Sequence, residues 1–165
     1  MKKLFFVWTL LMASLFCYAV QAQNNQKNLN QAELVKRYLG LWKAEVGKDT
    51  TIWFETSAYG ENAFLGSFKT KVKDKIIFET KQMWIYDKKS DKIFGVELEK
   101  KSGTFTYYLS RFISENIYEG TAIKDIMHPD IIDQTFYEKF KSPDIFIQSF
   151  ISNNQKVSIT YKRIK

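Results

Sequence analysis

Apolar residues recur with two different periods along the chain, and the change of period occurs at Gly40. Before Gly40, the apolar residues between Leu34 and Leu39 have the three-to-four-residue spacing of an amphipathic helix. Asn30, followed by Glu33 three positions later, is typical of a helix N-terminus, because a side-chain oxygen there accepts from free backbone N–H groups of the first turn. The pattern predicts one short helix that begins at Asn30 and ends at Gly40.

After Gly40, runs of β-branched and aromatic residues alternate with short groups of Gly, Asn, Asp, Ser and Lys, a pattern typical of antiparallel strands joined by turns. We expect about ten strands, at Leu41–Val46, Thr50–Ser57, Ala63–Val72, Ile76–Tyr86, Lys92–Lys100, Thr104–Phe112, Ile117–Ala122, Gln134–Phe140, Ile145–Ser152 and Lys156–Ile164. Connections this short force antiparallel neighbours. Because an open meander leaves two exposed edges, the chain predicts an all-β fold, an antiparallel meander closed into an eight- to ten-stranded barrel.

The stretch from Lys124 to Asp133 interrupts this rhythm and has Pro129 in its middle. It is predicted as the longest loop, and long loops on rigid scaffolds frequently carry function. It contains His128, the only histidine of the chain, whose spacing from the nearby aspartates matches no established metal site. We therefore predict no metal and no cofactor, with an axial haem ligand from His128 as a minor alternative. A Ser-His-Asp hydrolase would need the same histidine, and the chain has no Gly-x-Ser-x-Gly element, so no enzyme is predicted.

The first 22 residues have the organisation of a secretory signal peptide. Lys2 and Lys3 precede an apolar run, and Val20-Gln21-Ala22 is a small-residue cleavage site. We expect a signal peptide at 1–22, a flexible segment at 23–29 and one domain at 30–165. This predicts an extracytoplasmic protein, periplasmic or secreted.

A lipoprotein anchored through Cys17 is the alternative to that localisation. We disfavour it, because Phe16 before the cysteine is too large for such a cleavage site. Since Cys17 belongs to the predicted leader, the mature chain would have no cysteine and no disulfide. Nothing later in the chain approaches 18 uncharged residues, so no stable membrane insertion is expected.

The chain carries 25 Lys and Arg against 18 Asp and Glu, a net charge of +7. The one dense basic alternation runs from Lys69 to Lys75 with a lysine at every second position. In an exported protein with acidic residues interspersed throughout, this indicates a solvated strand face and its turn. We therefore predict no nucleic-acid partner.

Alternation within three strands selects the residues that we expect to face the barrel interior. The sets are Phe94, Val96 and Leu98; Phe105, Tyr107 and Leu109; and Val157, Ile159 and Tyr161. Phe94, Phe105, Tyr107 and Tyr161 are the predicted ligand-binding residues of such an interior. Arg111 shares a face with Tyr107, so it is the candidate anchor for a ligand carboxylate. The alternative for Arg111 is a strand-end residue that reaches solvent.

Gly40-Leu41-Trp42 stands at the start of the first strand, after a short helix and before a meander, and Lys162-Arg163 lies on the last strand. In these features the chain resembles the calycin superfamily, and within it the small bacterial lipocalin-like proteins, which place a basic residue over the tryptophan. The resemblance implies that Trp42 and Arg163 close one end of the barrel, and that the barrel holds an apolar ligand. Gly47-Lys48-Asp49 leaves no room for the helical lid of fatty-acid-binding proteins, so specific ligand residues are not transferred.

Two functions remain open on this basis. The first is an exported, non-enzymatic binding protein with a small hydrophobic or amphipathic ligand in the barrel cavity, which ten strands have room for. The second is a structural or interaction protein with a filled barrel, in which outward aromatics such as Trp53, Trp84 and Phe146 form an interface, including that of a homo-oligomer. An aromatic content of 16% is compatible with both.

Overall fold

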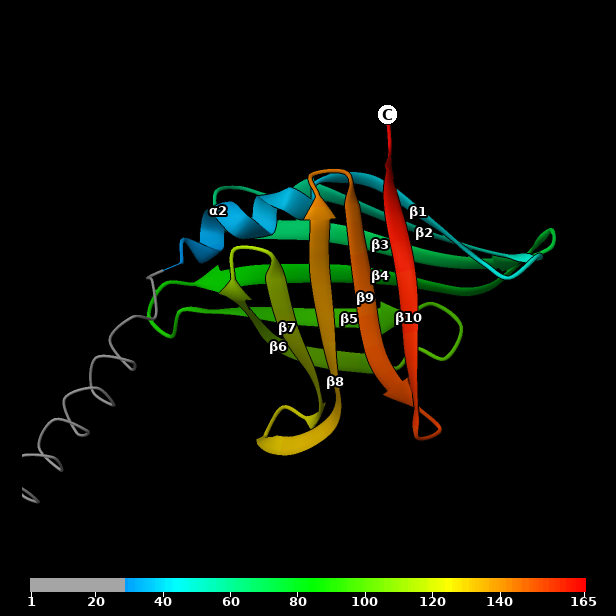
Figure 1. The fold of residues 1–165 in the computed structure, drawn as a ribbon. Coiled ribbons are helices and arrows are strands. Elements are labelled where there is room, and N and C mark those ends of the chain that lie inside the picture. The colour runs from blue at the N-terminus through cyan, green and yellow to red at the C-terminus, as the bar shows by residue number, and fades with distance from the viewer. Residues whose placement is uncertain (1–28) are drawn as a thin grey trace, which may run out of the picture.

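The computed structural model describes residues 29–165, and within this range ten strands form one closed antiparallel barrel (Figure 1). The elements are α2 (Gln31–Val35), the 3-10 turn η1 (Lys36–Tyr38), β1 (Gly40–Val46), β2 (Thr50–Ala58), β3 (Ala63–Val72), β4 (Lys75–Asp87), β5 (Lys92–Glu99), β6 (Phe105–Ser114), β7 (Ile117–Asp125), β8 (His128–Ser142), β9 (Ile145–Ser152) and β10 (Gln155–Ile164). Each strand pairs with its neighbours in sequence, and β1 pairs with β10. The predicted all-β meander barrel with a short N-terminal helix is confirmed. The predicted signal peptide, Cys17 and residues 23–28 lie outside the described residues.

The short helix covers one end of the barrel, beside the turn between β6 and β7 (Figure 1). It begins as predicted, because the Asn30 side chain accepts a hydrogen bond of 3.2 Å from the backbone N–H of Glu33. Gln31 is buried and bonds to both backbone groups of Phe112 on β6: its Nε2 donates to the carbonyl at 2.9 Å, and its Oε1 accepts from the N–H at 2.7 Å. This pairing extends the hydrogen bonding of β6 onto the helix and fixes its position.

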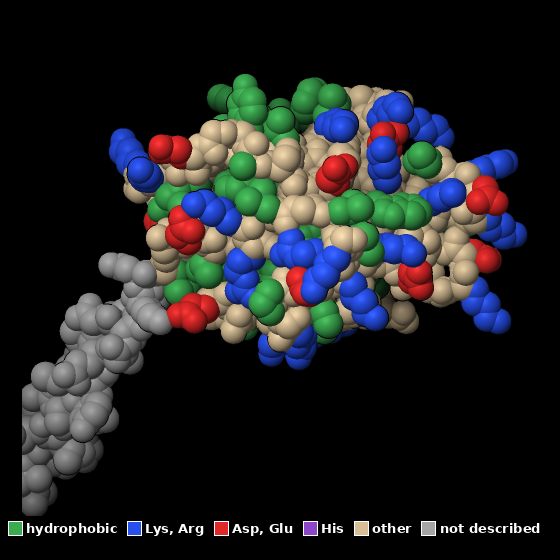
Figure 2. All heavy atoms as spheres, turned by 90° about the horizontal axis from the view of Figure 1, so that it is seen from above, with side chains coloured by type: hydrophobic (Ala, Val, Ile, Leu, Met, Phe, Trp, Pro, Cys, Tyr) green, Lys and Arg blue, Asp and Glu red, His purple; other side chains and the backbone are tan. Residues whose placement is uncertain are grey.

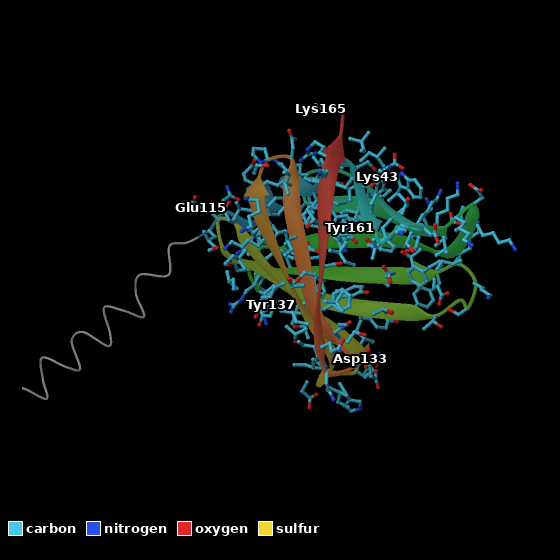
Figure 3. The ribbon with its side chains drawn as sticks, turned by 45° about the vertical axis from the view of Figure 1, so that its right-hand side comes forward. Lys43, Glu115, Asp133, Tyr137, Tyr161 and Lys165 are labelled. Carbon is cyan, nitrogen blue, oxygen red and sulfur yellow. The ribbon has the colours of Figure 1, made fainter. Side chains whose placement is uncertain are left out.

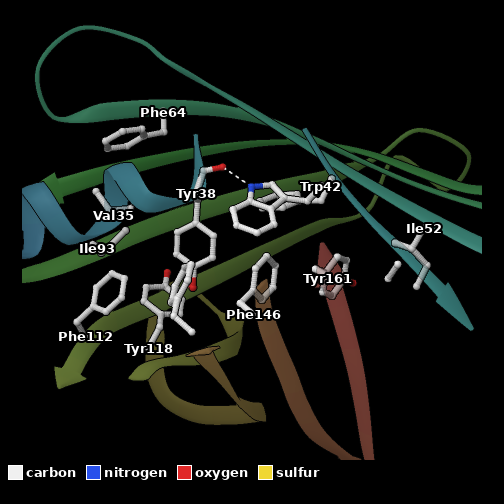
Figure 4. Packing of buried hydrophobic residues seen from close by; sticks show 13 residues of the cluster. Val35, Tyr38, Trp42, Ile52, Phe64, Ile93, Phe112, Tyr118, Phe146 and Tyr161 are labelled. Atoms are coloured by element: carbon white, nitrogen blue, oxygen red, sulfur yellow. Dashed lines mark hydrogen bonds between the residues drawn. The ribbon is translucent and has the colours of Figure 1, made fainter. Parts of the chain in front are cut away.

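Arg37 attaches the end of the helix to the same side of the barrel. Its guanidinium lies 4.0 Å from the centre of the Phe140 ring and donates to the carbonyl of Glu115 and, at 3.2 Å, to Oδ1 of Asn116. Tyr38 follows and points into the barrel, where the residue is 5% exposed. The helix therefore plugs this end, and Tyr38 packs among the rings of the aromatic cluster (Figure 4).

Closure of the sheet between β1 and β10 depends on Arg163, which lies directly across from Trp42 in the register. The guanidinium stacks on the indole, 4.1 Å from the ring centre. It donates to the carbonyls of Leu39, Arg37 (2.8 Å) and Pro143 (3.1 Å). Its Nε also donates to Oδ1 of Asp144 at 3.1 Å. The contact expected from the Gly-x-Trp resemblance is thus present, and it joins the plug, both closing strands and the turn between β8 and β9.

Gly40 is required at the first residue of β1 for two reasons. Its φ of +113° is a backbone conformation that L side chains rarely adopt, and a Cβ there would lie 3.0 Å from Nη1 of Arg163. The indole Nε1 of Trp42 donates at 2.7 Å to the carbonyl of Tyr38, which also accepts from the Thr56 hydroxyl. These bonds satisfy a carbonyl at the end of the plug, where the helix can supply no partner.

The prediction of a long loop from Lys124 to Asp133 is wrong. These residues form the end of β7, a tight turn at Ile126 and Met127, and the first part of β8. Asp125 pairs with His128 across the turn, and its side chain accepts from the N–H of Met127 at 2.9 Å. Pro129 is tolerated because it stands near the beginning of the strand, where a missing N–H disrupts little of the ladder. The hairpin extends beyond the barrel wall (Figure 1).

The outer surface mixes apolar side chains with many lysines and fewer acidic residues (Figure 2). In the basic alternation, Lys69 lies 3.5 Å from Glu79 and Lys71 lies 3.5 Å from Asp74, while Lys73 has the positive φ of a turn residue. These lysines therefore occupy a solvated strand face and its turn, as predicted. Within residues 29–165, no helix has the length and hydropathy that crossing a membrane requires.

Replacing Arg163 with lysine tests how much the barrel depends on this closure. The charge is kept, but the planar fork that stacks on Trp42 and bonds to several carbonyls is lost. Since Arg163 is 23% exposed and Asp144 44% exposed, we expect a loss of about 1–3 kcal/mol in the free energy of unfolding, measured by urea denaturation. The matched control is Arg111→Lys on the exposed outer face of β6, and equal losses in both variants would contradict the role given to Arg163.

Candidate functional site

The barrel encloses a cavity of about 520 Å³. Its wall is built by residues from the plug and most strands: Val35, Tyr38, Phe54, Phe68, Phe78, Gln82, Trp84, Glu97, Thr106, Tyr108, Tyr118, Ala122, Asp133, Gln134, Phe136, Glu138, Phe146, Gln148, Phe150 and Tyr161. Tyr161 lies part-way along β10, and Asp133 lies towards the end remote from Glu115 and the plug (Figure 3). Because Asp133 is exposed while the residues near the plug are buried, we place the mouth at this remote end.

Aromatic rings form the closed end of the cavity (Figure 4). The Tyr38 ring meets Tyr118 edge-on with centres 5.5 Å apart, and it meets Phe146 edge-on at 5.6 Å. Phe146 in turn stacks on Tyr161 with centres 4.6 Å apart and an angle of 11° between the planes. Contacts of this kind favour a rigid wall, since edge-to-face and stacked ring pairs add to the free energy gained by burial.

Two glycines on the inner face of the barrel keep its volume open. Gly95 lies directly across from Trp84, and a Cβ on it would lie 2.5 Å from Cδ1 of the indole. Gly120 lies directly across from Phe136, and a Cβ on it would lie 2.1 Å from Cζ of that ring. The rings thus lie flat against the backbone of the neighbouring strand instead of projecting into the centre.

Glu138 is a carboxyl group buried at the closed end. It is 7% exposed, accepts a hydrogen bond from the Tyr38 hydroxyl, and accepts another from Nε2 of Gln148 at 2.8 Å. Burial raises the pKa of Glu138 to about 7, although the hydrogen bonds from Tyr38 and Gln148 oppose the rise. Near neutral pH, this group is therefore divided between its neutral and charged forms.

A second carboxyl group, that of Glu97 on β5, lies in the wall nearer the mouth. It accepts from the hydroxyl of Thr80 at 3.1 Å, from Nε2 of Gln82, and from the hydroxyl of Tyr108 at 3.3 Å. The pKa of Tyr108 is raised, mainly by burial and then by the negative charge of Glu97 and the hydrogen bond to it. The negative charge of Asp133 contributes to the same rise. The polar part of the cavity is thus acidic, and the carboxyl groups of Glu97 and Glu138 accept from neutral donors.

Two buried side-chain oxygens in the described part of the chain have no hydrogen-bond partner, Oε1 of Gln82 and the hydroxyl of Tyr161. Both residues line the cavity. Tyr161 is 2% exposed, and its burial together with the nearby charge of Glu138 raises its pKa. Buried polar atoms without partners are rare in folded proteins and destabilise them, so these two mark positions where a bound molecule would complete the hydrogen bonding.

Of the predicted ligand-binding residues, only Tyr161 lines the cavity. Phe94 and Phe105 are 47% and 56% exposed, and Arg111 is exposed as well. Tyr107 alternates with the inward Tyr108, so it also lies on the outer face. The assignment of these four residues to the interior is therefore wrong, because the outer face of β5 and β6 is as apolar as an inner face.

The inner face of these two strands is more polar than the sequence pattern suggested. On β5 it presents Ile93, Gly95 and Glu97, and on β6 it presents Thr106, Tyr108, Ser110 and Phe112. The hydroxyl of Ser110 lies 2.5 Å from that of Tyr118 and 3.1 Å from the carbonyl of Ile93. A mixed inner face of this kind gives no clear alternation of apolar and polar residues. Gly95 and Glu97 are the only residues of this face whose type could have indicated that it faces the cavity.

Two of the aromatics predicted to face outward are also misassigned. Trp84 and Phe146 line the cavity, whereas Trp53 alternates with the buried Ile52 and Phe54 on β2 and faces outward. Both strands that carry the misassigned rings have apolar residues on both faces, so alternation could not choose between them.

His128 is exposed at the start of β8, away from the cavity wall. Among residues 29–165, no three His, Cys, Asp or Glu side chains are grouped closely enough to hold a metal ion. Comparisons of the chain with models of protein families, with curated proteins and with solved structures found no match.

The buried carboxyl group predicts a pH dependence of stability that Glu138→Gln removes. Because the pKa of Glu138 is raised on folding, the native state binds more protons than the unfolded state between about pH 4.5 and pH 7. Stability must therefore fall as pH rises through this window, and glutamine, which does not ionise, escapes the loss. We expect the variant to gain about 1–3 kcal/mol over the natural protein at pH 8, and little at pH 4.5, in urea denaturation.

The control for this experiment is Glu55→Gln on the exposed outer face of β2. It should follow the natural protein at both pH values. If the difference between Glu138→Gln and the natural protein is the same at pH 4.5 and pH 8, Glu138 does not retain its proton in the folded state.

Proposed function

We propose that this protein binds a small apolar or amphipathic molecule inside the barrel and does not act on it chemically. The observation that carries the proposal is the cavity of about 520 Å³ with rings on most sides and a few polar groups. Sites for small molecules usually have volumes of about 300–1,000 Å³, mostly apolar walls, and a small number of placed polar groups. The unpartnered oxygens of Gln82 and Tyr161 support a site that is completed by a ligand.

The calycin resemblance belongs to the same proposal. A closed barrel that begins at Gly40-Leu41-Trp42 and has Arg163 over the indole agrees with it. An extracytoplasmic location, periplasmic or secreted, rests on the leader pattern at residues 1–22. A carrier or scavenger outside the cytoplasm is the role that these features favour together.

Ala122→Phe tests binding inside the barrel, because Ala122 is 6% exposed and its side chain belongs to the cavity wall. The neutral fluorescent probe N-phenyl-1-naphthylamine should bind the natural protein saturably and gain fluorescence, as expected in a dry apolar site. A phenyl group at position 122 occupies part of the same volume, so we expect an affinity lower by roughly tenfold or more, equivalent to about 1.4 kcal/mol.

Ala58→Phe at the exposed end of β2 is the matched control, and it should leave the affinity of the probe unchanged. Equal affinity of the natural protein and Ala122→Phe would place the probe elsewhere and count against the proposal. Extraction of the protein purified from its own source, followed by mass spectrometry, should then identify the natural ligand.

A second candidate function, association with another protein surface, is favoured by the outer face of β3 to β6. Cross-strand pairing places apolar residues side by side on this face: Leu65, Met83, Ile85, Phe94, Val96, Leu98, Phe105, Tyr107 and Leu109. Several are more than a third exposed, among them Leu65, Phe94 and Phe105. Contiguous apolar patches of this kind mark interaction sites, and two copies of the chain could pair such faces about a two-fold axis.

Phe94→Lys tests this second function by placing a charge at the centre of the face. If the face joins two copies, the natural protein should sediment as a dimer at micromolar concentrations and the variant as a monomer. Glu55→Gln on the outer face of β2 is the control, and it should leave the oligomeric state of the protein unchanged. A natural protein that stays monomeric at every concentration would remove self-association through this face.

A further inference from the structure

The charges on the cavity wall indicate which class of small molecule would bind there. This inference rests on the proposed binding function. Three carboxyl groups belong to the wall, those of Glu97, Asp133 and Glu138, and no Lys or Arg appears among the lining side chains that the structure describes. A ligand with a carboxylate would therefore bring a like charge into a site of low dielectric constant, which is unfavourable. A ligand with a positive charge would find charges of opposite sign.

The closed end of the cavity combines a buried carboxyl group with several aromatic rings. Glu138 accepts from Tyr38 and Gln148, both neutral, so its charge has no described cationic partner. The rings of Tyr38, Tyr118, Phe146 and Tyr161 surround this end, with centre-to-centre distances of 5.5 Å, 5.6 Å and 4.6 Å along the series Tyr38–Tyr118, Tyr38–Phe146 and Phe146–Tyr161. Faces of aromatic rings attract cations, and cages of such rings recognise ammonium groups.

The hydroxyl of Tyr161 supplies an independent indication at the same place. It is buried without a partner in a residue that is 2% exposed and lines the cavity from β10. Tyr161 stacks on Phe146, and Glu138 pairs with Gln148 two positions further along β9, so both groups belong to the same part of the cavity wall. An ammonium group has three donors and no acceptor, so it can bond to a carboxylate and a phenol oxygen at once.

We propose that the natural ligand is a small amphipathic amine, whose protonated amino group binds Glu138 and the hydroxyl of Tyr161 while its apolar body lies against Trp84 and Phe136. This assignment replaces the expectation that Arg111 holds a ligand carboxylate, since Arg111 is exposed on the outside of the barrel. Glu97 and Asp133, nearer the mouth, add a negative potential that favours entry of a cation.

Three probes of nearly equal shape separate the alternatives in the natural protein: tryptamine, tryptophol and indole-3-acetate. They carry an ammonium, a hydroxyl and a carboxylate on the same ring. Measured by isothermal titration at pH 7.5, tryptamine should bind roughly tenfold to hundredfold more tightly than tryptophol, because a charge-assisted bond replaces a neutral one. Indole-3-acetate should bind more weakly than both.

Two variants locate the amino group. Glu138→Gln should reduce the affinity for tryptamine to that for tryptophol and leave the affinity for tryptophol within about twofold. Tyr161→Phe should weaken tryptamine binding by a smaller factor without loss of stability, because the hydroxyl has no partner to lose. Glu55→Gln on the outer face of β2 is the control and should leave all three affinities unchanged.

The other outcomes separate the assignment of an amine from the proposed binding function. Binding of indole-3-acetate as tight as that of tryptamine, or a preference for tryptamine that survives in Glu138→Gln, would overturn the assignment of an amine, while the cavity would remain a binding site. If none of the three probes binds but N-phenyl-1-naphthylamine does, the amine assignment is wrong and the binding function stands. If no probe binds, both proposals fail.

Discussion

The stack of Arg163 on Trp42 is the contact on which the rest of this barrel depends. A meander of ten strands closes only if the last strand pairs with the first, and this pair has a short register of three residues beginning at Leu41. The guanidinium adds hydrogen bonds to the carbonyls of the plug and to the turn between β8 and β9 at the same point. Because a rigid planar fork meets several acceptors at once, one side chain positions the plug, the first strand and the last strand relative to one another.

The plug then determines what the closed end of the cavity contains. It places Tyr38 among the rings of Tyr118, Phe140 and Phe146. The hydroxyl of Tyr38 reaches Glu138, so the position of the plug and the environment of the buried carboxyl group are linked. A substitution at Arg163 should therefore shift Tyr38 and alter its hydrogen bond to Glu138. The effect would pass through the backbone between Leu39 and Tyr38, without any contact between Arg163 and a ligand.

Much of this fold follows from the sequence, because turns and strands are local features. The helix cap at Asn30 and the ten strands can be predicted from short patterns, whereas the contact between Trp42 and Arg163 is implied by the calycin resemblance. The inner face of the barrel cannot be predicted in this way, since alternation shows that residues share a face without showing which face is inside. On β5, Phe94 and its apolar neighbours form the outer face, while the inner face includes Gly95 and Glu97.

The same difficulty explains why the polar groups of the site were missed. A glutamate within a strand pattern, as at Glu97 and Glu138, ordinarily indicates a side chain in solvent. Here the neighbouring strands supply Thr80, Gln82 and Gln148 as donors, and these partners become adjacent only when the strands pair. A buried polar network depends on cross-strand register, which is a property of the closed sheet and not of any single strand.

The composition of the cavity is therefore more informative about function than its size. An aromatic core that served stability alone would gain from an apolar residue in place of Glu138, because burial of an ionisable group without an opposite charge is unfavourable. Burial accordingly raises the pKa of Glu138. Retaining such a group beside the unpartnered hydroxyl of Tyr161 costs stability in the empty barrel, and a positively charged ligand that pairs with both would recover it, so folding and binding would be thermodynamically linked through this one carboxyl group.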